Sequence, residues 1–277
     1  MTARLHGGDV TLGPERLVVE EPMEIRLDDR FVASTMRTPG HDYELAVGFC
    51  LTEGLLGGAQ VRTVCYCATG PASETFFNVV SVSTGGAAPV PEVRLPSTTG
   101  SAGLSGAASL DAIRRRLSPV PGPPPPIRMS ALVRSAAETR ARQELFDQTG
   151  ASHAASDFDP VTGDVRLVRE DVGSHNAVDK VIGRLLLDGG LPASGRGLFV
   201  SGRATFEIVQ KAWAAGFGLV VAVDGPSGLA VDTACAAGMV LVGFLRGEDA
   251  TVYSPEPAPG DLPAPDDRAP AVPNERP

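Results

Sequence analysis

The first third of the chain has its hydrophobic positions at strand spacing. Residues 20–37 alternate apolar and polar side chains on both sides of Asp28 and Asp29, and this period of two predicts a β-hairpin that turns at the two aspartates. Three further elements are expected: a helix from Asp42 to Gly54 and two β-rich runs at 61–67 and 75–82. Together they predict an N-terminal β-rich subdomain over about 15–97.

A different pattern follows the proline-rich break at 119–126. After a helix expected at about 130–147, strands alternate with helices, which requires crossover connections and predicts a mostly parallel sheet. The expected strands are 164–170, 197–202, 219–225 and 239–247, and the helices are 175–187, 205–216 and 227–238. The fold class is therefore α/β, with helices on both faces of the sheet over about 127–254.

Two segments have compositions that do not favour a packed core. Residues 98–109 belong to a stretch rich in Gly, Ser and Thr, which predicts a flexible loop that leads into a helix at 110–117. Residues 255–277 are rich in proline and poor in apolar side chains, so this tail is expected to be disordered.

The charge balance excludes some partners. A formal net charge of -9 over 277 residues argues against nucleic acid or an anionic membrane as a general partner, because both attract cationic surfaces. The N-terminal residues lack the apolar run of a signal peptide, and no stretch reaches the ~18 apolar residues of a membrane span. We expect a cytoplasmic protein, whose four cysteines are thiols rather than disulfides.

Lysine is rare in a chain rich in arginine. Lys180 and Lys211 are the only lysines among 24 basic residues, which indicates two places that need a compact ammonium rather than a planar guanidinium. Lys180 lies in the segment 168–183, where Glu170, Asp171 and other polar residues crowd the start of an apolar helix. So many polar groups are more than a core helix requires.

Three consecutive strand-to-helix turns, at 170–176, 201–205 and 224–228, are small and polar. In an open α/β sheet, ligands bind beyond the carboxyl ends of the strands, where helix N-termini present free N–H groups. We therefore predict that the turns converge on one pocket for phosphates or a polar heterocycle, with a wall made by His175, Asn176, Lys180, Ser201, Arg203 and Ser227.

Purely structural interpretations of these residues stay open. Polar turns also cap helices in any such fold, and His175 is suited to a capping role held by a backbone carbonyl. Glu207 and Lys211, four residues apart, are equally consistent with a solvated pair on one helix face.

Signatures of common nucleotide and metal sites are missing. The chain has no Walker A sequence, no G-x-G-x-x-G and no zinc deaminase motif. Cys65 and Cys67 are separated by one residue, which is not zinc spacing, so no metal site is expected. Small apolar side chains beside a sheet are the plainer interpretation of this pair, and Cys50 and Cys235 are expected on apolar helix faces.

Several ordered motifs in the chain resemble those of one family. They are 36–54, 77–82, 150–155, 169–183, 201–216, 225–231 and 243–247. On these residues the chain, from about 20 to 254, resembles the formate dehydrogenase accessory protein family, FdhD.

The resemblance implies a fold and a function. The fold is cytidine deaminase-like without the deaminase zinc site, usually in a homodimer, and the FdhD-like domain spans 15–254. Family members carry sulfur from a cysteine desulfurase to the molybdenum cofactor, bis-molybdopterin guanine dinucleotide, before the cofactor enters formate dehydrogenase, and a guanine nucleotide is a partial mimic of this cargo. The family's cofactor contact corresponds to Phe244, Leu245, Arg246, Gly247, Glu248 and Asp249, with Arg246 as the expected anion contact.

The chain departs from the family pattern where sulfur is held. The family carries a persulfide on a CGxCG loop followed by a lysine, and the corresponding residues here are Ala102, Ser105 and Ala107. Alanine has no nucleophile, and a serine hydroxyl does not hold sulfane sulfur. We therefore expect no sulfur transfer through this loop.

Two classes of function remain for the chain. The first is a sulfur carrier that uses Cys65 or Cys67 as a relocated thiol. The second is a non-catalytic chaperone or regulator that binds the molybdenum cofactor. The chain also departs from the family pattern at Ser174, where the family has an arginine. This residue lies in the turn 170–176, which is predicted to be part of the binding site.

Overall fold

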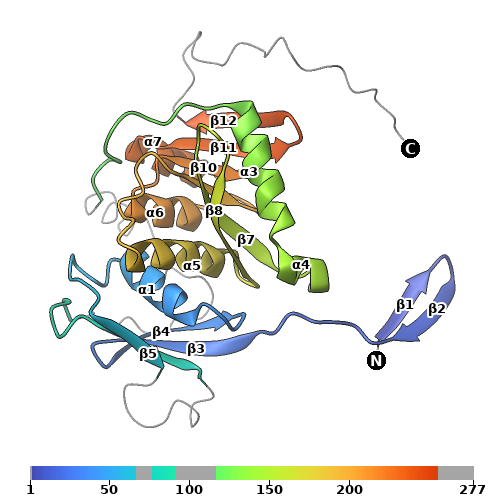
Figure 1. The fold of residues 1–277 in the computed structure, drawn as a ribbon, viewed down its shortest axis with the longest axis horizontal. Coiled ribbons are helices and arrows are strands. Elements are labelled where there is room, and N and C mark those ends of the chain that lie inside the picture. Colours follow the sequence, from blue (N-terminus) through green and yellow to red (C-terminus); the bar gives the residue numbers. More distant parts are fainter. Residues whose placement is uncertain (1, 67–76, 91–116, 255–277) are drawn as a thin grey trace.

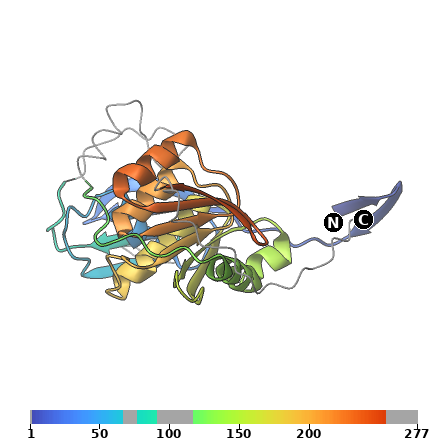
Figure 2. The same ribbon diagram turned by 90° about the horizontal axis from the view of Figure 1, so that it is seen from above.

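The computed structural model describes residues 2–66, 77–90 and 117–254, which form two sheets and a separate hairpin (Figure 1). The loop predicted at 98–109, the helix predicted at 110–117 (all but its last residue), the tail 255–277 and Cys67 lie outside these residues. The hairpin, β1 (Thr2–His6) and β2 (Asp9–Gly13), extends away from the rest of the chain when the molecule is seen from above (Figure 2).

The N-terminal β-rich region is confirmed. Its sheet has the strand order β4-β3-β6-β5, with the strands β3 (Glu21–Leu27), β4 (Arg30–Arg37), β5 (Thr63–Tyr66) and β6 (Val79–Ser83). The predicted hairpin is β3 and β4, and both turn residues, Asp28 and Asp29, have positive φ. Helix α1 (Asp42–Thr52) packs its buried side chains against the inner face of this sheet.

The second sheet has six strands in the order β12-β11-β10-β9-β7-β8. These strands are β7 (His153–Phe158), β8 (Val165–Asp171), β9 (Gly197–Val200), β10 (Leu219–Ala222), β11 (Val240–Arg246) and β12 (Asp249–Ser254). Pairing is parallel for β9 with β10 and for β10 with β11, and antiparallel for the other three pairs. The sheet is therefore mixed, and the prediction of a mostly parallel sheet is wrong.

The error comes from β12, an unpredicted antiparallel strand at one edge of the sheet, and above all from β7, which the hydrophobic pattern did not reveal. Five of its six residues are buried, from Ala154 to Phe158, so the strand lacks the alternation that marks a half-exposed strand. β7 lies antiparallel between β8 and β9. The helix expected at about 130–147 is also two helices, α3 (Met129–Ala141) and α4 (Glu144–Thr149), because the chain leaves the helical conformation at Arg142 and Gln143.

Helices cover both faces of the six-stranded sheet, as predicted. Helices α5 (Ser174–Leu187), α6 (Phe206–Ala215) and α7 (Gly228–Ala237) share one hydrophobic core with one face, whereas α3 packs on the other (Figures 1 and 2). The N-terminal region joins this unit where α1 crosses α5. Gly48 and Gly183 make the approach possible, since a Cβ on Gly183 would lie 1.8 Å from the backbone oxygen of Glu44.

Candidate functional site

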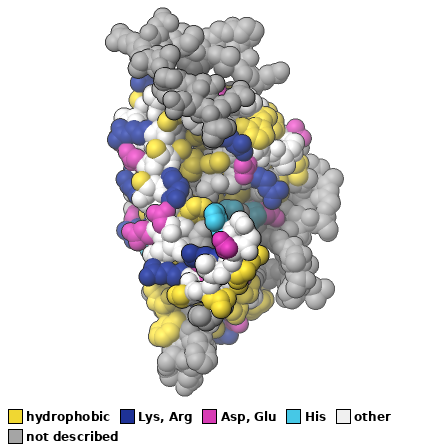
Figure 3. Space-filling view, turned by 90° about the vertical axis from the view of Figure 1, so that its right-hand side faces the viewer, with side chains coloured by type: hydrophobic (Ala, Val, Ile, Leu, Met, Phe, Trp, Pro, Cys, Tyr) yellow, Lys and Arg dark blue, Asp and Glu magenta, His cyan; other side chains and the backbone are white. Residues whose placement is uncertain are grey.

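Four strands of the six-stranded sheet end at one edge. β9, β10 and β11 are parallel, and β8 runs in the same direction because both β8 and β9 are antiparallel to β7. The three predicted turns therefore leave the sheet at the same edge as the β11–β12 turn. That turn is on the right-hand side of Figure 1, the side that Figure 3 views, where basic and acidic side chains are interspersed over the surface.

The first turn, from β8 into α5, is organised by Asp171. One carboxylate oxygen accepts hydrogen bonds from the backbone N–H of Gly173 at 2.9 Å and from the side chain of Asn176 at 3.0 Å. The other oxygen accepts from the backbone N–H of Thr38 at 3.1 Å and lies 2.7 Å from Nζ of Lys180. Asp171 is fully buried, so this carboxylate fastens the N-terminal region to the turn.

Lys180 and Asn176 make further contacts between the turn and the N-terminal region. Lys180 is buried and also donates to the backbone oxygens of Thr38 and Glu170, at 3.0 and 3.2 Å. Asn176 donates to the backbone oxygen of Met36 at 2.7 Å. Lys180 therefore holds the turn together from a buried position, and its role at a binding site stays a prediction.

Lys211 has a similar environment one helix away. Its ammonium is buried, 2.8 Å from Asp179 and 3.2 Å from Glu53, and donates to the hydroxyl of Thr52 at 3.0 Å. Burial acts to lower the pKa of Lys211, but the two carboxylates outweigh it and raise the pKa. The interpretation of Lys211 and Glu207 as a solvated pair is therefore wrong for Lys211.

His175 lies between the first and second turns. Its Nε2 is 2.8 Å from a carboxylate oxygen of Glu207 and 3.3 Å from the hydroxyl of Thr205. Thr205 is the N-cap of α6 and accepts a hydrogen bond from the backbone N–H of Ile208. His175 is about one quarter exposed, so the imidazole can reach a ligand while Glu207 and Thr205 hold the ring in place.

The second and third turns place the remaining predicted residues. Ser201 accepts a hydrogen bond from the backbone N–H of Ala154 at 2.9 Å. Arg203 is exposed at the same edge. Ser227 caps α7 by accepting from the backbone N–H of Ala230 at 3.2 Å, a structural role that the sequence analysis had kept open.

The end of β11 is packed against the third turn. Phe244 has a left-handed backbone conformation, with φ of 54°, and a Cβ on Gly225 would lie 2.5 Å from its ring. Arg246 lies 3.4 Å from Asp224, and its side chain is 70% exposed. Gly247, Glu248 and Asp249 are exposed in the β11–β12 turn, whereas Leu245 is buried in the core.

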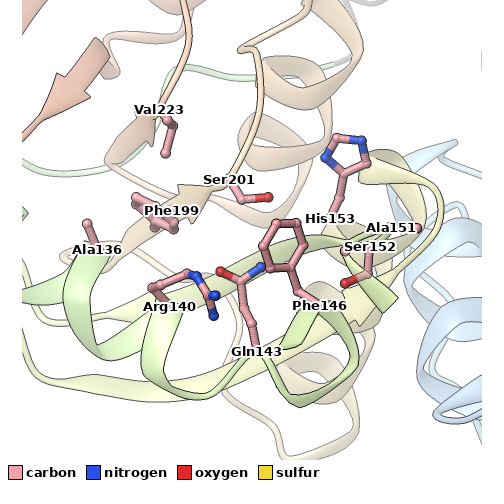
Figure 4. Close-up of a pocket in the computed structure, with 11 residues that line it drawn as sticks. Ala136, Arg140, Gln143, Phe146, Ala151, Ser152, His153, Phe199, Ser201 and Val223 are labelled. Atoms are coloured by element: carbon pink, nitrogen blue, oxygen red, sulfur yellow. The ribbon is translucent and has the colours of Figure 1, made fainter. Parts of the chain in front are cut away.

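A pocket of about 550 Å³ opens between this edge and the helices α3 and α4 (Figure 4). Its wall is formed by Ala136, Arg140, Gln143, Phe146, Gly150, Ala151, Ser152, His153, Phe199, Ser201 and Val223. Of the six residues predicted to share a pocket, only Ser201 lines this one. The end of β11 lies close by, because Val223 of the wall precedes Asp224, the partner of Arg246.

Most residues of this wall were not predicted from the sequence. Glu170 builds it by accepting hydrogen bonds from the backbone N–H groups of Leu145 and Phe146, at 2.8 and 2.9 Å, and from the hydroxyl of Ser152 at 2.6 Å. The carboxylate thereby caps α4 and joins it to β7. The one available signal was the motif 150–155, which marked the start of β7 without showing its place in the sheet.

The described cysteines differ in exposure. Cys65 is exposed on β5, an edge strand, and Cys235 is also exposed, against expectation for an apolar helix face. Cys50 is buried as expected, and burial raises the pKa of its thiol to about 12. No group of three His, Cys, Asp or Glu residues in the described part of the chain could hold a metal ion. No helix of that part is long and apolar enough to cross a membrane.

Fold and edge together define a class: a mixed α/β protein with an N-terminal β-rich region and a pocket at the carboxyl edge of its larger sheet. The model of the FdhD/NarQ family matches residues 18–258. The chain therefore belongs to the FdhD/NarQ family, and the resemblance found in its sequence is confirmed.

Several relatives share nearly the whole length of the chain. The sulfur carrier protein FdhD of Streptomyces avermitilis is 47% identical over 261 residues, which cover 91% of this chain and 92% of the relative. The protein of the same name from Anaeromyxobacter dehalogenans is 45% identical and covers 91% of this chain and 90% of the relative. The crystal structure of a proposed formate dehydrogenase accessory protein from Desulfotalea psychrophila has the same fold, with a TM-score of 0.70, 24% identity and coverage of 91% and 94%.

Proposed function

We propose that this chain is a formate dehydrogenase accessory protein of the sulfur carrier class, which delivers sulfur to the molybdenum cofactor before the cofactor enters formate dehydrogenase. The family match over 18–258 supports this function. The relatives of similar length that are named sulfur carrier proteins support it further.

The proposed cargo is bis-molybdopterin guanine dinucleotide, bound along the carboxyl edge. Arg203 and Arg246 present exposed guanidinium groups there, suited to the phosphates of a dinucleotide, and His175 adds a partly exposed imidazole. The predicted contact 244–249 lies beside the pocket wall at Val223. A pocket of about 550 Å³ falls within the usual range for small-molecule sites, ~300 to 1,000 Å³.

Guanosine diphosphate tests this binding, as the partial mimic of the cargo. Calorimetric titration is expected to give binding that weakens about tenfold or more in Arg246→Ala and in Arg203→Ala, because each removes a charge-assisted contact with phosphate. Arg166→Ala is the matched control, because Arg166 is an exposed arginine that pairs with Asp159 at the opposite edge of the sheet. Absence of heat at millimolar ligand contradicts the proposed cargo.

Sulfur carriage needs a thiol. Because positions 102 and 105 are alanine and serine, that thiol must lie elsewhere in the chain. In the proposed step, a cysteine thiol attacks the terminal sulfur of the desulfurase persulfide. The S–S bond of the desulfurase breaks, its cysteine leaves as a thiol, and the sulfane sulfur becomes the terminal sulfur of a new persulfide. Cys65 is the first candidate because it is exposed on an edge strand. Cys67, outside the described residues, is the second.

A second function is favoured by the same sequence observation. Without cysteines at 102 and 105, the chain is suited to a non-catalytic role as a chaperone or regulator that binds the molybdenum cofactor. The two functions differ in whether sulfur ever becomes covalently attached to this protein.

Radiolabelled sulfur separates them. The protein is incubated with a cysteine desulfurase and labelled cysteine, and the label is mapped by mass under non-reducing conditions. A carrier acquires label that is lost in the Cys65→Ala, Cys67→Ala double variant and kept in Cys235→Ala. A binding chaperone acquires none and still binds guanosine diphosphate.

The topology, the oligomeric state, the location and the partners of the chain are proposed from its family. We propose a cytidine deaminase-like topology for the larger unit, a homodimer as the working form, and a cytoplasmic location where a cysteine desulfurase and formate dehydrogenase are its partners. The family resemblance supports each of them.

A further inference from the structure

Gln143 is a buried polar residue whose carboxamide has no partner in the described part of the chain. The residue lies between α3 and α4 and is only 4% exposed. Its backbone N–H and C=O are bonded to Arg140 and Asp147, but its side chain makes no hydrogen bond to a described residue. Its two amide atoms are not among the buried polar atoms that lack a partner, so they reach the open space of the pocket that Gln143 lines and are available there to a ligand or to water.

The carboxamide of Gln143 points into the pocket. Figure 4 shows it between Arg140 and Phe146, with its oxygen and nitrogen turned toward the space below Ser201. The neighbouring polar groups are already engaged: Ser152 donates to Glu170 at 2.6 Å, and Arg140 is paired with Asp147 at 2.6 Å. Gln143 therefore supplies a donor and an acceptor side by side to whatever occupies the pocket.

The rest of the wall fits a flat ring. Phe199 and Val223 form an apolar side, and the Phe146 ring lies under the Arg140 guanidinium, 4.9 Å from it. Aromatic and apolar walls with a small number of convergent polar groups are typical of sites for heterocycles. A primary amide pairs through two parallel hydrogen bonds with a ring edge that carries an N–H next to a C=O.

We propose that Gln143 is the specificity-determining residue of this pocket, and that it pairs with the lactam edge of a 2-amino-4-oxopyrimidine ring. This ring chemistry occurs in guanine and in pterin, so the inference rests on the proposed function, whose cargo contains both. The pocket then holds a ring of the cargo while Arg203 and Arg246 at the same edge hold its phosphates.

The test combines one side-chain change with one ligand change. Guanosine is compared with N1-methylguanosine, which lacks the ring N–H, on the full-length protein and on Gln143→Leu, by calorimetry. Loss of the paired edge is expected to weaken the unmodified protein's binding by about 10- to 100-fold, whereas Gln143→Leu binds both ligands equally weakly. If Gln143→Leu weakens both ligands by the same factor while their ratio is kept, Gln143 has only a structural role and the proposal is overturned.

A second variant covers the case in which Gln143→Leu fails to fold. Gln143→Glu keeps the shape of the side chain and presents two acceptors, which match the ring N–H and the exocyclic amine of guanosine but not adenosine. The ratio of guanosine to adenosine affinity is expected to rise at least tenfold in Gln143→Glu. An unchanged ratio contradicts the proposal.

The source of the ring and the proposed function are tested separately. Binding of 6-hydroxymethylpterin that depends on Gln143, without such dependence for guanosine, assigns the pocket to the pterin, and the reverse assigns it to guanine. If guanosine diphosphate binds through Arg246 and neither ring depends on Gln143, the inference fails and the proposed function stands. If neither the rings nor the diphosphate binds, both fail.

Discussion

Lys180 Nζ lies 2.7 Å from Asp171 Oδ2, and both side chains are almost completely buried. Three acceptors converge on the ammonium, since it also donates to the backbone oxygens of Thr38 and Glu170. A compact group with three donors suits this arrangement, whereas a planar guanidinium does not. The structure thus explains why position 180 is a lysine in a chain whose other basic residues are nearly all arginine.

Lys180→Arg is therefore expected to destabilise the protein although it keeps the charge. The larger side chain has no room and cannot direct its donors at all three acceptors. Lys180→Met removes one partner of a buried pair and is expected to cost about 3 to 5 kcal/mol. Urea unfolding measures both. Arg184→Lys is the control on the same helix, because Arg184 is half exposed, its close partner Asp188 at 2.7 Å is also half exposed, and its distance to Glu44 is 3.9 Å. A Lys180→Arg protein as stable as the parent contradicts this account.

The contact between α1 and α5 leads to a second prediction. Alanine at Gly183 or at Gly48 would place a Cβ within 2 Å of the partner helix backbone, so the helices must separate. Gly183→Ala is expected to destabilise by ~3 kcal/mol or more, at the upper end of overpacking effects. Thermal unfolding measures the change. Gly228→Ala is the control, since it meets no atom within 4 Å, and an equal effect of both changes rules out the steric explanation.

These two sites show what the sequence could predict. The lysines and the polar turn at 170–176 were visible as unusual residues, and their position at the carboxyl edge followed from the alternation of strands and helices. Their partners were not visible, because Thr38 and Met36 approach from a segment more than 130 residues earlier in the chain. A pattern along the chain contains no information on such contacts.

The pocket was hidden for a related reason. β7 is buried on both faces, so no period marked it, and without β7 the position of α4 beside the edge could not be placed. Gln143 lies in what the periodicity predicted as one continuous helix. Its exposure to the pocket depends on the break between α3 and α4, which a helical pattern with suitable spacing concealed.

Glu44 makes stability depend on pH. Its carboxylate accepts two hydrogen bonds from Arg169, at 2.5 and 2.8 Å. Burial opposes ionisation, but the hydrogen bonds from Arg169 and His41 outweigh it and lower the pKa of Glu44 from 4.5 to about 2. A lowered carboxyl pKa stabilises the fold above the unfolded value and loses that effect as the pH falls toward 2, with about 3 kcal/mol involved at neutral pH.

Glu44→Gln is thus expected to reduce the free energy of unfolding at pH 7. The difference in this free energy between the variant and the parent protein, the stability gap, should narrow as the pH falls from 4.5 toward 2. Denaturant unfolding at several pH values measures the gap. Glu15→Gln removes an exposed pair with Arg4 and should change little at any pH. A gap that stays constant below pH 4.5 would show that Glu44 acts through packing and not through its charge.

The thiols are expected to react unequally. Because burial raises the pKa of Cys50 to about 12, almost none of it is thiolate at pH 8, whereas Cys65 and Cys235 are exposed. Iodoacetamide at pH 8 should alkylate Cys65 and Cys235 in the native protein and reach Cys50 only after denaturation. Peptide mass mapping checks each site. Alkylation of Cys50 at the rate of Cys235 under native conditions contradicts the burial of α1 against the N-terminal sheet.

Restoring the family's cysteines is the sharpest test of what the chain has lost. Positions 102 and 105 now offer a methyl group and a hydroxyl, neither of which holds sulfane sulfur. In a Cys65→Ala, Cys67→Ala background, Ala102→Cys with Ser105→Cys is expected to acquire labelled sulfur from a cysteine desulfurase, because the scaffold belongs to the family over 18–258. Ala102→Ser with Ser105→Ala is the matched control without a thiol and should stay unlabelled. If the restored cysteines remain unlabelled while the same desulfurase charges a relative that has the CGxCG loop, more than the thiols has changed, and the replacement of the family's lysine at Ala107 and arginine at Ser174 becomes the next place to look.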